Sequence, residues 1–188
     1  VNAVLGAITV AILRTARWFD AAKTADFGAR SLRAIGPFLP EHRTGRNNLR
    51  AAFPDKSAAE IEAILLKVWE NLGRFGGEFA HLDRVWDFDP ARPERSRIEF
   101  SQRSEEIFNA LIADNKGALI FSAHLGNWEL PALAAPAHGL KSAVLYRPPS
   151  IGAVDRAVQR IRGVNMGEII ATTPHAPVHL AAVLERGV

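Results

Sequence analysis

A histidine and a carboxylate five residues apart are the residues of this sequence best suited to acid–base chemistry. His124 directly follows the apolar run 118–123, and Glu129 ends the segment His-Leu-Gly-Asn-Trp-Glu. A neutral imidazole accepts a proton near neutral pH, and a carboxylate on its other nitrogen fixes the tautomer and stabilises the imidazolium. The pair therefore predicts a general base with an orienting partner. The alternative is a His and a Glu that only cap a helix.

The nucleophile for such a base is expected to belong to the substrate. The 188 residues include no cysteine, and no serine lies in a Gly-x-Ser-x-Gly turn. The absence of cysteine also excludes disulfides and Cys-ligated metals. We therefore expect the His-Glu pair to activate a substrate hydroxyl, which then attacks an acyl carbon.

A metal centre is the weaker interpretation of the histidines. His124 and Glu129 have no convincing third ligand in the sequence. His175 and His179 are four residues apart and could share a helix face, but Pro177 lies between them and no acid adjoins them. Surface histidines explain this second pair better, so neither a metal nor another cofactor is predicted.

The five-residue spacing restricts where the pair can lie. In one continuous helix, five residues turn through about 500°, which leaves the two side chains about 140° apart. His124 is therefore expected in a loop at the end of a strand, with Glu129 in the first turn of the next helix. Gly126 gives the turn its freedom, Asn127 suits the helix cap, and Pro131 is tolerated near the helix start.

The surrounding pattern predicts an α/β fold, a mainly parallel sheet flanked by helices and preceded by an amino-terminal helical region. The run 118–123 is continuously apolar, as in a strand buried on both faces. Further strands are expected at 143–146 and 169–170, and helices at 104–113 (capped by Ser104), 127–137, 152–162 and 176–186, the last ended by Gly187. Strands alternating with helices favour parallel pairing, with the site outside a strand's carboxyl end.

The amino-terminal part is apolar and basic. Residues 1–50 hold eight Lys or Arg and three Asp or Glu. The apolar run 1–13 is shorter than the roughly 20 residues that span a membrane. We expect residues 1–40 to form a membrane-associated amphipathic region and residues 41–188 to form the α/β domain. A signal peptide and a solvated surface helix are the alternatives.

Within residues 41–188, a long helix is predicted after a basic loop at 43–50. Ser57 and Glu60 have the spacing of a capping box. The pair Gly76-Gly77 either weakens this helix or lets another backbone pack closely. Its buried stripe is expected to be Ile61, Leu65, Val68, Leu72, Phe75, Phe79 and Leu82.

Three stretches resemble one enzyme family. Residues 121–129 resemble the His-x4-Asp/Glu block of glycerolipid acyltransferases, and more narrowly that of the bacterial lipid A biosynthesis (lauroyl/myristoyl, late) acyltransferases. Residues 45–54 and 68–74, with Glu78, are similar to the family's amino-terminal region. Residues 146–148, 155–156 and Arg162 are similar to the block that follows the catalytic one.

The resemblance implies transfer of a fatty acyl chain from acyl carrier protein or coenzyme A to a hydroxyl of a lipid A precursor. It also implies work at the cytoplasmic face of the bacterial inner membrane. His124 would be the general base and Glu129 its partner. Arg162 matches a family arginine needed for activity, and Asn127 and Arg147 would contact substrate. For Arg147 a surface ion pair is an equal alternative.

Other functions remain open at this point. The acceptor could be another glycolipid or a glycerophospholipid, or the chain could be a non-enzymatic membrane-peripheral module that works through its basic amino-terminal helix. Nucleic-acid binding ranks last, because the basic groups adjoin an apolar helix and aromatic residues make up only 8%. Family members continue past residue 188, so the domain is expected to be truncated at its carboxyl end.

Overall fold

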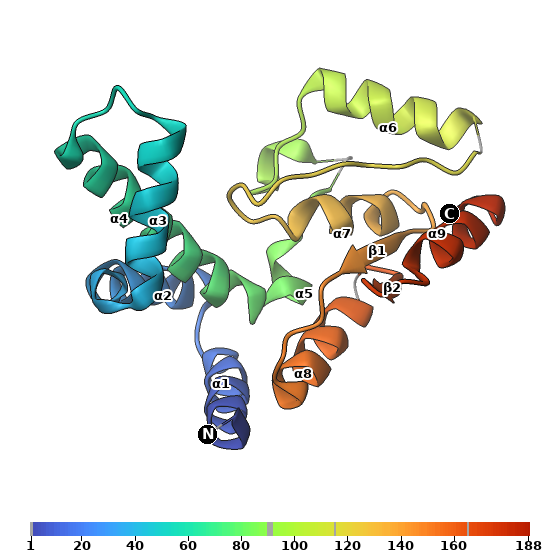
Figure 1. Cartoon of the computed structure of the whole chain (residues 1–188). Coiled ribbons are helices and arrows are strands. Elements are labelled where there is room, and N and C mark those ends of the chain that lie inside the picture. Colours follow the sequence, from blue (N-terminus) through green and yellow to red (C-terminus); the bar gives the residue numbers. More distant parts are fainter. Residues whose placement is uncertain (1, 90–91, 115, 165) are drawn as a thin grey trace. The chain divides into compact units, whose positions relative to one another are not determined.

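The computed structural model describes residues 2–89, 92–114, 116–164 and 166–188 (Figure 1). The chain divides into two compact units. Residues 13–81 form one, here called the helical unit, and residues 1–12 with 82–188 form the other, here called the sheet unit. The mixed α/β class is confirmed in part, because helices dominate and the described sheet has two strands.

The helical unit contains α2 (Ala21–Ile35), the 3-10 turn η1 (Gly36–Phe38), α3 (Pro40–Ala52) and α4 (Ala58–Phe79). The capping box of α4 is confirmed, since the Ser57 side chain accepts from the Glu60 N–H and Glu60 accepts from the Ser57 N–H. The predicted loop at 43–50 is wrong, because this segment lies within α3. Pro40 starts that helix with a favourable φ.

The inward face of α3 is polar, which explains why an apolar pattern did not reveal it. His42 is buried, and its Nε2 lies 3.0 Å from a carboxylate oxygen of Glu62 on α4. Arg46, one turn further, hydrogen-bonds the other Glu62 oxygen. The Trp69 indole N–H donates to His42 Nδ1 at 3.0 Å. Hydrogen bonds to α4 therefore hold α3 in place of the apolar stripe that usually marks a packed helix.

This cluster makes the stability of the helical unit depend on pH. The hydrogen bond from Arg46, assisted by His42, lowers the pKa of Glu62 from 4.5 to about 2 despite partial desolvation. The contribution of a carboxylate with a depressed pKa is complete above its unfolded value and lost as it protonates. We therefore expect the free-energy difference between wild type and Glu62→Gln to be constant above pH 4.5 and to shrink toward pH 2.

Urea unfolding followed by circular dichroism at several pH values measures this difference. Glutamine keeps the side-chain shape and removes the titrating proton. A difference that stays constant down to pH 2 would contradict the assigned role of Glu62.

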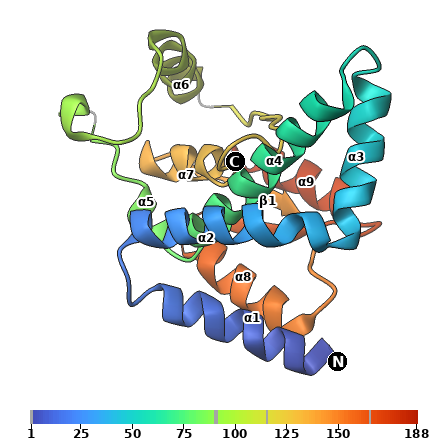
Figure 2. The same cartoon turned by 90° about the vertical axis from the view of Figure 1, so that its left-hand side faces the viewer.

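Helices α2 and α4 cross at very close range (Figure 2). A Cβ on Gly73 would overlap the Gly28 carbonyl, and one on Gly77 would lie 2.6 Å from the Ala25 Cα. The interpretation of the glycine pair as a close-packing device is therefore confirmed at Gly77. At Gly76 a Cβ would meet nothing.

The buried face of α4 differs from the predicted stripe. Ile61, Leu65 and Phe79 are buried as expected, but Val68 and Leu72 are exposed. The inward positions between them are Trp69, Gly73 and Gly77. Glycine carries no hydropathy signal, so the stripe was assigned to the wrong register where the helices approach most closely.

The sheet unit contains residues 2–12 of α1 (Asn2–Ala16) and the elements after residue 81. These are α5 (Leu82–Val85), η2 (Pro93–Arg95), α6 (Gln102–Asp114), α7 (Leu130–Ala137), β1 (Ala143–Tyr146), α8 (Gly152–Gly163), β2 (Glu168–Ala171) and α9 (Ala176–Glu185). Strands β1 and β2 pair in parallel, with Ala143 opposite Glu168. Figure 1 shows α7 above and α8 below this pair.

Most predictions for the second half of the chain are confirmed. Both short strands, the helices near 152–162 and 176–186, and the positive φ of Gly187 are present. Helix α6 begins slightly earlier than expected, because the Ser101 hydroxyl accepts from the Ser104 N–H and takes the capping role given to Ser104. Ile170, Ala176 and Val183 form a small core between β2 and α9.

The predicted buried strand at 118–123 is wrong. Figure 1 shows this segment returning from α6 toward α7 as irregular chain, and Phe121 is 90% exposed. A strand needs a neighbour to satisfy its backbone groups, and among the described residues the paired strands are β1 and β2. Residues 118–121 instead line a cavity of about 400 Å³ together with side chains of β1 and α9.

The amino-terminal region expected at residues 1–40 is divided into α1, α2 and the turn η1. The chain turns at 17–20, and the Asp20 side chain caps α2. Val1 lies outside the described residues. On α1, Gly6 is buried against Ile151, while Val4, Leu5, Ile8 and Ile12 are exposed. Within the described ranges, no helix has the length and apolar character needed to cross a membrane.

Candidate active site

The turn between residues 124 and 129 has part of the predicted form: it is a loop, but residues 118–123 before it form no strand and Glu129 lies just ahead of the helix instead of in its first turn. His124 lies in irregular chain and Gly126 has a φ of +54°, so the glycine supplies the left-handed conformation that the turn requires. Helix α7 begins at Leu130, and its cap is Glu129 rather than Asn127. Asn127 still fixes the turn, because its side-chain oxygen accepts from the Glu129 N–H at 3.1 Å. Pro131 lies in the first helical turn, as expected.

Glu129 is the buried charge of this site. Only 3% of the residue is exposed, and Arg162 of α8 donates to both of its carboxylate oxygens, at 2.9 Å from Nε and 2.5 Å from Nη2. Side-by-side guanidinium–carboxylate bonds of this kind are directional and stronger than bonds between neutral groups. Arg162 therefore supplies the counter-charge that a buried carboxylate needs.

Arg162 in turn lies over an aromatic ring. Its guanidinium carbon is 5.8 Å from the ring centroid of Tyr146, the last residue of β1. The Tyr146 hydroxyl donates to Asp155 at 3.3 Å and accepts from the Gln159 amide at 2.6 Å. Burial, and then the Asp155 charge, raise the pKa of Tyr146, which keeps the phenol protonated.

His124 lies at the surface beside Trp128, with 5.0 Å between the ring centroids. A hydrogen bond between His124 and Glu129 is not among the contacts of the described residues. Each carboxylate oxygen has two lone-pair sites, so the bonds from Arg162 leave room for an imidazole N–H. The dyad remains a prediction.

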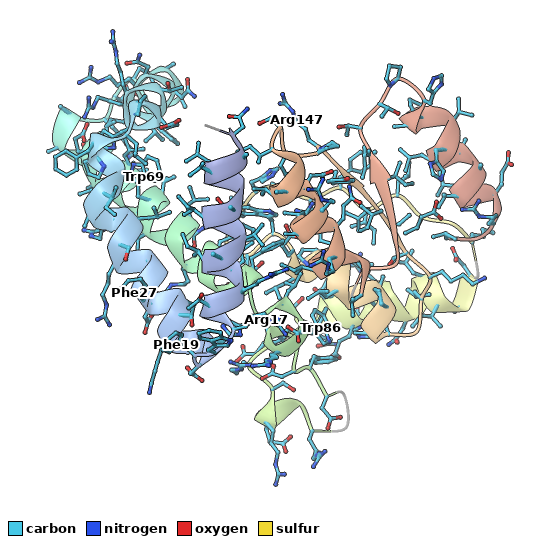
Figure 3. All side chains as sticks on the ribbon, turned by 90° about the horizontal axis from the view of Figure 1, so that it is seen from below. Arg17, Phe19, Phe27, Trp69, Trp86 and Arg147 are labelled. Atoms are coloured by element: carbon cyan, nitrogen blue, oxygen red, sulfur yellow. The ribbon has the colours of Figure 1, made fainter. Side chains whose placement is uncertain are left out.

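The other candidate residues lie in different settings. Arg147 is exposed in the loop that follows β1 (Figure 3). His179 lies 2.6 Å from Glu168 of β2, an acid that is distant in sequence. In the part of the chain that the structure describes, no three His, Asp or Glu side chains gather as a metal site.

Sequence reasoning missed the polar contacts around Arg162. Asp155, Gln159 and Arg162 are spaced at i, i+4 and i+7, so they lie along one face of α8. That spacing could have indicated a shared polar face. The pairing of Arg162 with Glu129 could not be predicted in this way, because the two residues are 33 apart in sequence.

Comparison with known proteins identifies the family. No curated protein and no solved structure matches the chain. The family model described as bacterial lipid A biosynthesis acyltransferase matches residues 3–175, which include all but the first residue of α1, the elements from α2 to β2, and the contacts of Glu129. The chain therefore belongs to the bacterial lipid A biosynthesis acyltransferase family.

Proposed function

We propose that the protein transfers a fatty acyl chain from an acyl thioester to a hydroxyl of a lipid A precursor. The donor would be acyl carrier protein or coenzyme A. The observation that supports this best is the buried Glu129–Arg162 pair, which joins the His-x4-Glu block to the block that follows it. Both blocks lie within the matched family range.

In the proposed reaction, His124 removes the proton from the acceptor hydroxyl as its oxygen attacks the thioester carbon. The tetrahedral intermediate then collapses, the carbon–sulfur bond breaks, and the imidazolium returns the proton to the leaving thiolate. Glu129 orients the imidazole and stabilises its positive form. Asn127 and Arg147 would contact substrate. No metal or cofactor takes part in these steps.

The cavity beside residues 118–121 supports a fatty donor. It has a volume of about 400 Å³, and most of its lining is apolar, from the irregular segment, β1 and α9. A hydrocarbon chain gains about 0.8 kcal/mol for each CH₂ removed from water. The segment that lines the cavity leads directly to His124.

The helical unit carries a surface suited to the cytoplasmic face of an anionic membrane. Phe27 and Phe38 are 74% and 86% exposed, and Lys23 and Arg30 are exposed nearby on α2. Figure 3 shows Phe27 at the outer side of that helix. Exposed aromatics flanked by cations favour insertion at the interface of anionic lipids. We therefore include binding to the inner-membrane surface in the proposal.

Replacing Phe27 and Phe38 together by serine should weaken binding to vesicles that contain phosphatidylglycerol by tenfold or more, since each buried aromatic contributes about 1.5–3 kcal/mol. Vesicle co-sedimentation measures the effect. Val178→Ser in α9 removes a similarly exposed apolar group outside the helical unit and should leave binding unchanged. Equal binding of the double variant and wild type would remove this surface from the proposal.

Mass spectrometry of lipid A tests the main reaction. Cells without a late acyltransferase would be complemented with the gene that encodes this chain. A mass gain of one secondary acyl chain is expected. Unchanged lipid A with newly acylated phospholipid would favour a glycerophospholipid acceptor. No acylation, with membrane binding retained, would favour the membrane-peripheral module.

A further inference from the structure

One face of α8 points toward the last residue of β1. Asp155, Gln159 and Arg162 lie on this face, and all three contact Tyr146. The Gln159 amide also donates to Asp155 at 2.9 Å, which closes a triangle of hydrogen bonds with the Tyr146 hydroxyl. Beyond the triangle, the ring of Tyr146 lies against Arg162, and Arg162 holds Glu129.

We propose that Tyr146 and Gln159 are positioning residues that hold Arg162 in the orientation in which its guanidinium grips both oxygens of Glu129. This role rests on the proposed acyl-transfer function, in which Glu129 orients the general base.

The need for positioning follows from the chemistry of arginine. A bidentate bond requires the planar guanidinium to lie nearly in the plane of the carboxylate, and a long, flexible side chain samples many other orientations. An aromatic face beside the guanidinium attracts the cation and removes part of that freedom. Tyr146 is only 7% exposed, so its ring is itself held by packing.

The hydroxyl of Tyr146 fixes the ring relative to α8. Without its bonds to Gln159 and Asp155, the ring could tilt and the first and middle turns of α8 would lose their tie to β1. Because Arg162 lies in the following turn and rests against the same ring, a small shift of ring or helix would turn its guanidinium away from the plane of Glu129. Misplaced catalytic groups cost rate rather than substrate affinity.

Three variants separate the ring from the hydroxyl. Tyr146→Phe keeps the ring, Tyr146→Leu removes both, and Gln159→Met removes only the donor. In acyl-transfer assays we expect kcat to fall roughly 3- to 10-fold for Phe and Met and roughly 10- to 100-fold for Leu, with KM unchanged. Arg160→Ala, exposed on the same helix, should match wild type. A change in KM alone would overturn the positioning role.

A cycle with Arg162→Lys tests whether Tyr146 acts through the arginine. Lysine keeps the charge but cannot make the bidentate bond. In that background Tyr146→Phe should change kcat less than about twofold, because coupled residues are not additive. A full effect that persists in the Lys background would mean that Tyr146 acts independently, and the proposal would fail.

A measurement that needs no catalysis tests the positioning role separately from the proposed acyl-transfer function. In NMR spectra of ¹⁵N-labelled protein, the Arg162 Nε–H resonance reports the hydrogen bond to Glu129. The resonance is assigned by its loss in Arg162→Lys. It should shift or exchange faster with water in Tyr146→Leu and Gln159→Met, but not in Arg160→Ala. An unchanged resonance in both variants overturns the positioning role even if the enzyme is active. A changed resonance in a chain without acyl transfer supports the geometry and rejects the proposed function.

Discussion

Replacing His124 by alanine should lower the rate of acyl transfer by about 10²- to 10⁴-fold, the usual contribution of a general base. The fold should be unaffected, because His124 is exposed and its ring contacts only Trp128 among the described contacts. Purified protein, an acyl thioester donor and a lipid A precursor allow the rate to be measured, and thermal unfolding verifies the fold.

The control is His175→Ala, which removes an exposed histidine at the start of α9. Its activity should equal that of wild type. Glu129→Gln should also lose activity, and it leaves Arg162 as a partly buried cation without its carboxylate partner, so its stability should fall as well. An active His124→Ala variant would reject the dyad mechanism, and the remaining acyl transfer would then need another base.

Gly73→Ala should destabilise the helical unit by about 1–3 kcal/mol, the range found when extra atoms are forced into a packed contact. Helix propensity alone predicts the opposite, because alanine is favoured over glycine by about 1 kcal/mol in a helix interior. Steric overlap outweighs the propensity gain here, so the net change in stability should be a loss. A Cβ at residue 73 would run into the backbone carbonyl of Gly28, and backbone cannot rotate aside as a side chain can.

Gly76→Ala is the matched control on the same helix. A Cβ there meets nothing, so the propensity gain should appear alone and stabilise the protein by about 1 kcal/mol. Urea unfolding of both variants measures the difference. If both alanines stabilise the protein equally, the close crossing of α2 and α4 does not exist in solution.

The elements that sequence reasoning predicted correctly are those whose own residues carry the signal. The strand at 143–146 and the helix after it are bounded by turn residues, and the segment between His124 and Glu129 follows from the freedom of Gly126 and the tolerance of Pro131 near a helix start. Residue type and local spacing likewise lead to the His-Glu dyad, which stays a prediction.

The predictions that failed depended on partners distant in sequence. Helix α3 was missed because His42 and Arg46 face a carboxylate on another helix instead of an apolar core. The run 118–123 is apolar enough for a strand, but its described surroundings offer no pairing strand. The partner of Glu129 was likewise invisible, because Arg162 meets it only once α7 and α8 have packed.

The hydrogen bond from Trp69 to His42 lets tryptophan fluorescence report the folding of the helical unit. The indole N–H donates to Nδ1, so the imidazole proton must sit on Nε2 and point at Glu62. Trp69 therefore emits from a dry environment, while Trp18, 82% exposed, emits from water. With the other three tryptophans, Trp18, Trp86 and Trp128, replaced by phenylalanine, the blue-shifted emission of Trp69 would report in real time when α3 and α4 separate, without any attached dye.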